Sequence, residues 1–284
     1  MMRKLKTNSP AKVNLFLYVK GRDHRGYHLL QSLFITIPSL NDKITIELNN
    51  SGIIRIESNT SIAVDDNIMT KAAKKLLDLK GNKSIGINFN LEKNIPIGAG
   101  LGGGSSNAAT TMIELNKILG LNLTIERLVE LSEDIGDDVK FFLMQKNAVY
   151  FDGDKMHEIQ LDRKFHLLLV KPDFSINTKD VYNAFRKDVK TTELKPVISQ
   201  EDILHHIITG ENQLYETVKK INPKIQSVID QIQEQSGCII SRMSGSGSTS
   251  FGIFENQKSS KEAMNRLLEV NPEWFIHMFS CENQ

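Results

Sequence analysis

The segment Pro96–Ser106 constrains this chain more than any other, and it reads Pro-Ile-Gly-Ala-Gly-Leu-Gly-Gly-Gly-Ser-Ser. Five of the 18 glycines of the chain lie between Gly98 and Gly104. Glycine lets a backbone adopt positive φ and approach a ligand closely. A predicted helix follows from about residue 105, and the unpaired N–H groups at its start favour a phosphate. We therefore interpret the segment as a phosphate-binding loop, with Ser105 or Ser106 capping the helix or binding a phosphate or its metal ion.

Two other phosphate-binding patterns partly match the same segment. Residues 98–103 fit the dinucleotide-binding pattern G-x-G-x-x-G, but the region 116–124, about 20 positions on, contains no acidic residue and follows a helix. Residues 98–105 nearly fit the P-loop, but Gly104 stands where that motif requires lysine. A cation for the phosphates is therefore expected from elsewhere in the chain, and Lys12 is the strongest candidate.

Composition excludes several classes of protein. The chain has 284 residues, of which 40% are hydrophobic and 24% charged, so it can build one large or two ordinary domains. A net charge of +1 argues against a dedicated nucleic-acid binder. No apolar run reaches the ~18 residues of a membrane span. Cys238 and Cys281 lie far apart in the sequence and lack the spacing of metal ligands, which argues against a disulfide framework or a zinc site and fits a reducing cytoplasm. We therefore expect a cytoplasmic enzyme.

Periodicity predicts a mixture of strands and helices. Alternating apolar residues predict half-buried strands, among them 12–19, 44–48 and 85–91. Helical spacing predicts helices near 66–77, 105–119 and 258–270, and over most of 203–235. Because several strands are expected to have one covered face, the pattern predicts an α+β fold rather than a doubly wound α/β fold.

Three further motifs are ambiguous when each is taken alone. Asp137 and Asp138 follow Gly136 in a turn, where a carboxylate can accept a hydroxyl proton or hold Mg²⁺, although Asp is also common in ordinary turns. Residues 244–249 read Ser-Gly-Ser-Gly-Ser-Thr, either a hairpin loop or backbone that approaches a ligand. Gly26-Tyr-His28 supplies two rings that either stack on a heterocycle or pack as partly buried aromatics.

Together these motifs resemble the GHMP kinase superfamily, which is named for galactokinase and for homoserine, mevalonate and phosphomevalonate kinases. Three segments occur in the order of that family: Ser9-Pro-Ala-Lys-Val-Asn-Leu15, which contains Lys12, then Pro96–Ser106 and Ser244–Gly247. The triple glycine at 102–104, with Gly26-Tyr-His28, resembles the branch that acts on a cytidine-diphosphate-linked methylerythritol. The resemblance covers nearly the whole chain.

The resemblance implies a two-domain α+β GHMP kinase fold. Residues 1–158 would form an ATP-binding domain similar to domain 2 of ribosomal protein S5, and residues 159–284 a ferredoxin-like domain. The implied reaction transfers the γ-phosphate of ATP, with Mg²⁺, to the 2-hydroxyl of the diphosphocytidyl-methylerythritol of the non-mevalonate isoprenoid pathway. The implied partner is this small molecule, with no nucleic acid and no membrane, and the chain is expected to be a monomer or weak homodimer.

The resemblance also assigns roles to single residues. Asp138 matches the catalytic base, and Asp137 stands where alanine is usual. Lys12 matches the catalytic lysine, which would stabilise the nascent alkoxide and the phosphoryl group and keep Asp138 ionised. The residues implied at the ATP site are Pro96, Ile97, Gly98, Ala99, Gly100, Leu101, Gly102, Gly103, Gly104, Ser105, Ser106, Asn67 and Lys93. The residues implied at the substrate site are Asn14, Tyr27, His28, Tyr182, Gly245 and Gly247, with Tyr27 and Tyr182 stacking on the cytosine and His28 hydrogen-bonding its edge.

Some positions depart from the pattern of the family. Lys140 stands where proline is usual after the Asp138 turn, and Asn177 and Lys179 replace prolines before Tyr182. Three alternatives stay open: a kinase for another small alcohol, a binding module that has lost catalysis, and an RNA binder, which the near-zero net charge opposes. The residues that would hold the metal ion are left open.

Overall fold

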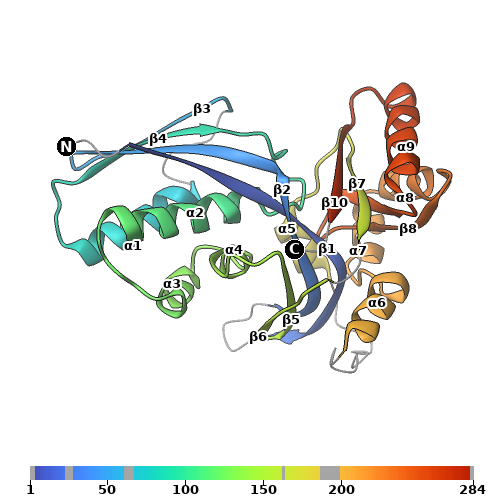
Figure 1. The fold of residues 1–284 in the computed structure, drawn as a ribbon, viewed down its shortest axis with the longest axis horizontal. Helices are drawn as coiled ribbons and strands as arrows, with labels where there is room; N and C mark the ends of the chain where they lie inside the picture. Colours follow the sequence, from blue (N-terminus) through green and yellow to red (C-terminus); the bar gives the residue numbers. More distant parts are fainter. Residues whose placement is uncertain (1–3, 23–27, 61–66, 162–163, 186–198, 282–284) are drawn as a thin grey trace. The chain divides into compact units, whose positions relative to one another are not determined.

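The computed structural model describes the chain except residues 1–3, 23–27, 61–66, 162–163, 186–198 and 282–284 (Figure 1). The chain divides into two compact units that interleave along the sequence. Unit 1 consists of Met1–Ala11, Ile37–Ile95 and Gly102–Lys146, and unit 2 consists of Lys12–Thr36, Pro96–Leu101 and Asn147–Gln284. The domain boundary expected after residue 158 falls inside unit 2 and stays a prediction.

Two long strands contribute residues to both units. Strand β1 spans Lys4–Arg22 and β2 spans His28–Asn49. Every residue of β1 from Ala11 to Val19 is buried, so the expectation of a half-buried strand is wrong there. The reason is that both faces are covered within unit 2. Leu17 and Val19 join a hydrophobic cluster, while the Phe16 ring packs against the rings of Tyr150 and His206.

Unit 1 combines a sheet with a pair of helices. The C-terminal half of β2 pairs antiparallel with β4 (Gly86–Glu92), and β3 (Ile54–Ser58) pairs parallel with β4. Helices α1 (Ile68–Lys80) and α2 (Gly103–Ile118) pack against each other along one face of this sheet (Figure 1). Two further helices, α3 (Ile125–Ser132) and α4 (Val139–Leu143), contact α2. The start of α2 thereby lies beside α1 and near the chain that leads into α4.

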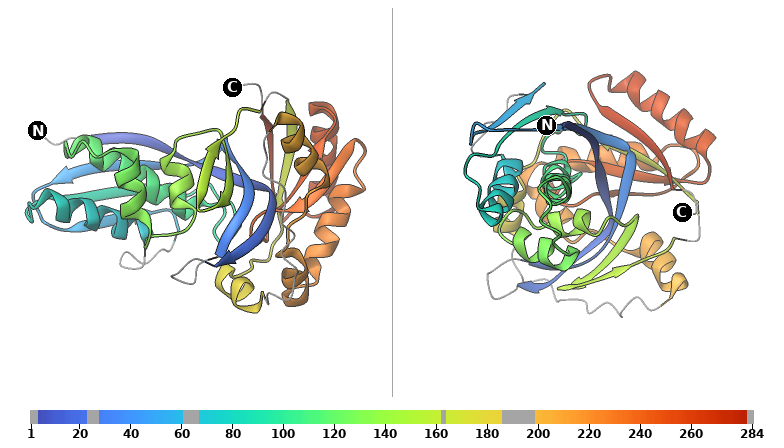
Figure 2. Two further views of the ribbon diagram at one scale, coloured as in Figure 1. Left: turned by 90° about the horizontal axis from the view of Figure 1, so that it is seen from below. Right: turned by 60° about the vertical axis from the view of Figure 1, so that its left-hand side comes forward.

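Unit 2 contains a four-stranded antiparallel sheet in the order β10-β7-β9-β8. Its strands are β7 (Phe165–Lys171), β8 (Cys238–Met243), β9 (Ser250–Phe254) and β10 (Phe275–Cys281). Helices α8 (Lys224–Gln233) and α9 (Gln257–Val270) contact each other and lie on one face, as the left-hand view of Figure 2 shows in orange and red. Numbered along the chain, the four strands have the order 4-1-3-2 of a ferredoxin-like β-α-β-β-α-β unit, which confirms that expectation.

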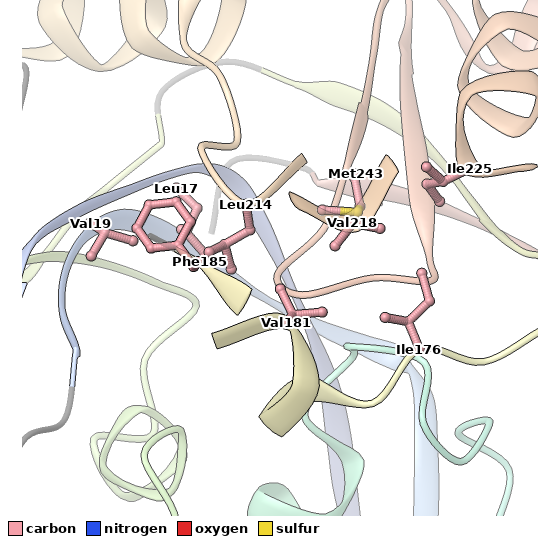
Figure 3. Packing of buried hydrophobic residues seen from close by; sticks show 9 residues of the cluster. All are labelled: Leu17, Val19, Ile176, Val181, Phe185, Leu214, Val218, Ile225 and Met243. Carbon is pink, nitrogen blue, oxygen red and sulfur yellow. The ribbon is translucent and has the colours of Figure 1, made fainter. Parts of the chain in front are cut away.

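The rest of unit 2 supplies a second set of strands and three short helices. The N-terminal half of β2 pairs with β5 (Ala148–Gly153), which pairs with β6 (Lys155–Glu158). The helical region predicted over 203–235 is divided into α6 (Gln200–Thr209), α7 (Tyr215–Ile221) and α8, and α5 (Thr178–Ala184) precedes it. Side chains from β1 and β8, and from the helices α5, α7 and α8 and the residues next to them, meet in one hydrophobic cluster: Leu17, Val19, Ile176, Val181, Phe185, Leu214, Val218, Ile225 and Met243 (Figure 3).

The mixture of helices and two sheets confirms the predicted α+β class. Within the described ranges, no helix is both long and apolar enough to span a bilayer.

Candidate active site

The helix that follows the glycine loop, α2, begins without a side chain that caps its first backbone N–H groups. It starts at Gly103, two residues earlier than expected, and its N-cap Gly102 has a φ of 69°. No side chain caps it, so the expectation that Ser105 or Ser106 caps the helix is wrong. Ser106 instead accepts a hydrogen bond of 2.7 Å from the Ser9 hydroxyl. The first-turn N–H groups of α2 are therefore left for a ligand, and an anion suits them best.

The preceding part of the loop belongs to unit 2 and packs against the second glycine loop. Gly98 and Gly100 have φ values of 67° and 75°, which favour glycine. A Cβ on Gly100 would lie 2.7 Å from the carbonyl oxygen of Gly247, so no larger residue fits. The Thr249 amide donates a hydrogen bond of 3.2 Å to the carbonyl of Ala99. Two glycine motifs that lie far apart in sequence thus form one packed backbone surface.

A buried ion pair in unit 1 holds the chain that leads into the loop. The carboxylate of Asp42 pairs with the Lys93 ammonium and accepts hydrogen bonds of 2.8 and 2.9 Å from the amides of Asn94 and Ile95. The Lys93 nitrogen lies 3.0 Å from the position that a Cβ on Gly103 would occupy. Lys93 therefore places its charge beside the start of α2. Asp42 could not be predicted as part of this region, because it lies in no sequence motif and binds residues about 50 positions away.

Asn67, which the resemblance places near the nucleotide, caps helix α1. Its side-chain oxygen accepts a hydrogen bond of 2.9 Å from the Met69 amide. The neighbouring Ile68 side chain would lie 3.4 Å from a Cβ on Gly104. The start of α1 is therefore adjacent to the start of α2. This arrangement gives Asn67 a structural task, and its contact with a nucleotide stays a prediction.

The turn that carries Asp138 also packs against the start of α2. The Val139 amide donates a hydrogen bond of 3.1 Å to the Gly136 carbonyl and closes the turn. A Cβ on Gly136 would lie 3.5 Å from the Ser105 hydroxyl oxygen. Asp138 is half-buried at the N-cap of α4, whereas Asp137 is exposed. Lys140 is part of α4, so this turn and helix form without the proline usual in the family.

In unit 2, Lys12 is a buried lysine with a fixed orientation. Only 3% of the residue is exposed, and its ammonium donates a hydrogen bond of 2.6 Å to the side-chain oxygen of Asn14. The same nitrogen lies 4.8 Å from the centroid of the Phe34 ring, within the range of a cation–π contact. The Lys12 amide donates to the carbonyl of Leu101 at 3.0 Å. Lys12 is thus positioned by its surroundings rather than solvated at a strand edge.

Asn14 joins Lys12 to the second glycine loop. Its side-chain nitrogen donates a hydrogen bond of 3.1 Å to the Ser32 hydroxyl, and its backbone amide donates one of 3.1 Å to the Ser244 hydroxyl. Gly245 has a φ of 56°, and a Cβ there would lie 3.2 Å from the Asn14 side-chain oxygen and 3.6 Å from the Lys12 nitrogen. Unit 2 therefore brings together three residues that the sequence assigned to the substrate or to catalysis.

The second glycine loop is held by side chains outside the predicted motifs. The Asn212 amide donates hydrogen bonds to the carbonyls of Met243 and Gly245 at 2.9 and 2.7 Å. The hydroxyls of Thr178 and Ser246 are 2.8 Å apart, so the residue that begins α5 is linked to the loop. A Cβ on Gly247 would lie 3.0 Å from the Met243 sulfur. No sequence motif indicated Asn212, because its partners lie about 30 residues away.

Two of the predicted base-binding rings contact each other. The ring centroids of His28 and Tyr182 are 4.8 Å apart with an angle of 30° between the planes, and Phe185 packs edge-on to His28 at 6.2 Å. This spacing leaves no room for a nucleobase between His28 and Tyr182. Tyr27 lies outside the described residues. A base would therefore stack on an outer face of the pair.

The predicted site residues are divided between the units. Unit 1 holds Asn67, Lys93, Gly102–Ser106 and Asp138, and unit 2 holds Pro96–Leu101 and the described residues assigned to the substrate, together with Lys12. In the part of the chain that the structure describes, no group of three or more His, Cys, Asp and Glu side chains is arranged to hold a metal ion.

Two family models match the chain. The model for the GHMP kinase N-terminal domain matches residues 67–146, and the model for the GHMP kinase C-terminal domain matches residues 201–273. The first includes the glycine-loop helix and Asp138, and the second includes Asn212 and the second glycine loop. The two-domain GHMP kinase fold expected from the motifs is thereby confirmed.

Individual relatives identify the branch. The chain is 35% identical over 261 residues to a 4-diphosphocytidyl-2-C-methyl-D-erythritol kinase of Nitrosomonas europaea, covering 91% of each chain. It is 36% identical over 265 residues to the enzyme of that name from Syntrophus aciditrophicus, covering 91% of this chain and 93% of the relative. A crystal structure of a 4-(cytidine 5'-diphospho)-2C-methyl-D-erythritol kinase superposes with a TM-score of 0.78 and 28% identity, covering 97% of this chain and 98% of that chain. The chain therefore belongs to the 4-diphosphocytidyl-2-C-methyl-D-erythritol kinase family of the GHMP kinases.

Proposed function

We propose that this protein transfers the γ-phosphate of ATP to the 2-hydroxyl of 4-diphosphocytidyl-2-C-methyl-D-erythritol, a step of the non-mevalonate isoprenoid pathway. The observation that carries the proposal is the buried Lys12 ammonium, held by Asn14 and the Phe34 ring beside the glycine loop 244–248. The names of the relatives support the choice of substrate. The enzyme would act in the cytoplasm on small molecules alone, as a monomer or weak homodimer.

In this proposal Asp138 is the general base and Lys12 its electrostatic partner. The Asp138 carboxylate takes the proton of the 2-hydroxyl as the oxygen forms its bond to the γ-phosphorus, and the bond from that phosphorus to the β-bridging oxygen breaks to release ADP. The Lys12 ammonium stabilises the negative charge on the alkoxide and on the transferred group. The half-buried turn of Asp138 beside Ser105 supports the placement of a base next to the phosphate loop.

The ATP phosphates would bind at the bare start of α2. Its uncapped N–H groups supply positive potential, the Lys93 ammonium lies nearby in its ion pair with Asp42, and Asn67 lies one residue before the adjacent helix. Mg²⁺ would be carried largely by ATP oxygens and water, since the described residues offer no cage of carboxylates. When bound, the ion neutralises phosphate charge.

The cytosine would stack on Tyr27 and Tyr182, with His28 hydrogen-bonding its edge. The contact between His28 and Tyr182, whose ring centroids are 4.8 Å apart, supplies a preformed aromatic surface. A kinase for a small alcohol without a base has no use for such a surface, so this pair favours the cytidine-linked substrate over mevalonate or homoserine.

The proposal is tested by measuring ADP release by the purified protein with Mg-ATP. We expect release that depends on 4-diphosphocytidyl-2-C-methyl-D-erythritol and does not occur with mevalonate or homoserine. Release with one of those alcohols instead would contradict the substrate assignment. ATP binding without release for any alcohol would favour a binding module that has lost catalysis.

A further inference from the structure

Asn212 lies in a short segment that is fixed against strand β1. The segment joins α6 to α7, and its backbone makes a parallel bridge with Leu17. The Leu17 amide donates to the Glu211 carbonyl at 2.9 Å, and the Gln213 amide donates to the Leu17 carbonyl at 2.9 Å. Only 5% of Asn212 is exposed. The backbone of Asn212 is therefore anchored on both sides before its side chain is considered.

The Asn212 side chain uses its amide to hold the second glycine loop. Its nitrogen has two hydrogens, and one hydrogen bond runs to the Met243 carbonyl and the other to the Gly245 carbonyl. Its oxygen accepts a hydrogen bond of 3.0 Å from the Leu214 amide. Leu17, Leu214 and Met243 pack into one hydrophobic cluster (Figure 3). A packed surrounding of this kind restricts the rotamers of the side chains within it.

The two carbonyls that Asn212 binds flank Ser244, which contacts Asn14. The Ser244 hydroxyl accepts a hydrogen bond of 3.1 Å from the Asn14 backbone amide, and the Asn14 side-chain oxygen accepts one of 2.6 Å from the Lys12 ammonium. A Cβ built on Gly245 would lie 3.2 Å from the Asn14 side-chain oxygen and 3.6 Å from the Lys12 nitrogen, so this part of the loop is close to both side chains. A continuous series of contacts, all inside unit 2, therefore leads from Asn212 through Ser244 and Asn14 to Lys12.

We propose that Asn212 is a positioning residue for phosphoryl transfer: it fixes the Ser244–Gly245 backbone and so sets where Lys12 and Asn14 lie. This inference rests on the proposed function, in which Lys12 stabilises the transferred group. A displacement of about 1 Å in such a group lowers turnover by up to about 100-fold. An amide that served stability alone would have no need to place both donors on the loop that contacts Asn14.

The test compares two Asn212 variants with a matched control in the same unit. Asn212→Leu removes both hydrogen-bond donors. Asn212→Asp also removes them but keeps an oxygen that can accept the hydrogen bond from the Leu214 backbone amide. The control is Asn271→Leu, because the Asn271 amide also donates twice, to the Gln231 side chain at 2.9 Å and to the Leu267 carbonyl at 3.2 Å. Asn271 follows helix α9 and has no part in the proposed site.

We expect both Asn212 variants to lower kcat about 10- to 100-fold, with KM for ATP and for the alcohol changed less than about threefold. Asn271→Leu should lower the midpoint of thermal unfolding comparably and leave kcat within about twofold. A kcat within about threefold of the parent in a folded Asn212 variant would overturn the inference, as would an equal loss in the control. If Asn212→Leu does not fold, Asn212→Asp decides.

Amide hydrogen exchange tests the same inference without turnover. The amides of Ser244 and Gly247 donate to the carbonyls of Thr249 and Ser244 at 2.9 and 3.0 Å. We expect both to exchange at least about tenfold faster in the Asn212 variants and unchanged in Asn271→Leu. Absence of turnover in the parent protein would refute the proposed function. Unchanged exchange of the Ser244 and Gly247 amides in the Asn212 variants would refute the role of Asn212 in positioning the loop, whether or not the parent protein turns over.

Discussion

The glycine-loop helix of unit 1 and the surroundings of Lys12 in unit 2 are built on opposite principles. The start of α2 presents backbone N–H groups with no side-chain cap. Lys12 is instead held through a network of buried side chains, among them Asn14, Ser32 and Ser244. A site made of backbone depends on conformation and space, whereas a site made of side chains depends on each hydrogen bond. The two regions should therefore differ in which substitutions damage them.

The largest effect is expected where unit 1 does rely on a side chain. Asp138→Asn should lower kcat at least about 1000-fold, because the amide cannot accept the hydroxyl proton, and should leave the affinity for ATP within a few fold. Asp137→Asn, its exposed neighbour, is the matched control and should stay within about threefold of the parent. Steady-state kinetics and nucleotide titration measure both. Turnover that survives in Asp138→Asn would show that another group is the base.

The next largest effect concerns the buried ion pair that supports the α2 region. Asp42→Asn should lower the free energy of unfolding by about 3 to 5 kcal/mol, since it leaves the Lys93 ammonium buried beside a neutral amide. Glu92→Gln removes the exposed pair with Lys43 and serves as the control, which should leave the denaturation midpoint nearly unchanged. Urea denaturation followed by circular dichroism compares them. Equal midpoints for the two variants would mean that the Asp42 pair contributes no more than a surface pair.

The two regions should also differ in how they tolerate a Cβ on a glycine. Gly245→Ala should lower kcat about 30-fold, because its Cβ would press on Asn14 at 3.2 Å in addition to the strain of a φ of 56°. Gly81→Ala has similar strain, with a φ of 70°, but its Cβ meets nothing within 4 Å. It should therefore lower stability modestly and leave kcat unchanged. If both variants lose the same activity, strain rather than contact with Asn14 explains the loss.

The smallest effect is expected at an exposed contact of unit 1. The Lys75 ammonium bonds Asp134 at 2.6 Å and holds the pKa of that carboxyl below its usual value of 3.8. The contact therefore stabilises the fold above the ordinary pKa and loses this contribution as the pH falls through the lowered pKa. In Lys75→Met, NMR titration should find the pKa of Asp134 raised, with little change in stability at neutral pH. An unchanged pKa would mean that Lys75 is not its cause.

What could be predicted from the sequence was local chemistry. The glycine loop and the helix after it were recognisable because they are contiguous in the sequence. The strands and α9 followed from periodicity, although periodicity could not reveal that both faces of β1 around Phe16 and Leu17 are covered. Asp42 and Asn212 could not be found in this way. Each is a common turn residue in sequence, and each acquires its task only when folding brings backbone groups 52 or 33 positions away into contact.

The interleaving of the two units has a consequence for how the chain can be made and cut. Unit 2 begins at Lys12, yet most of it follows Asn147. During synthesis, its first segment therefore leaves the ribosome well over a hundred residues before most of the residues that it packs against. Many of its pairings also close long loops, which slows folding. Severing the polypeptide after residue 158 would give a fragment that carries Lys12–Thr36 together with its partner strand β5 but without the rest of unit 2. Neither fragment would correspond to one of the two units.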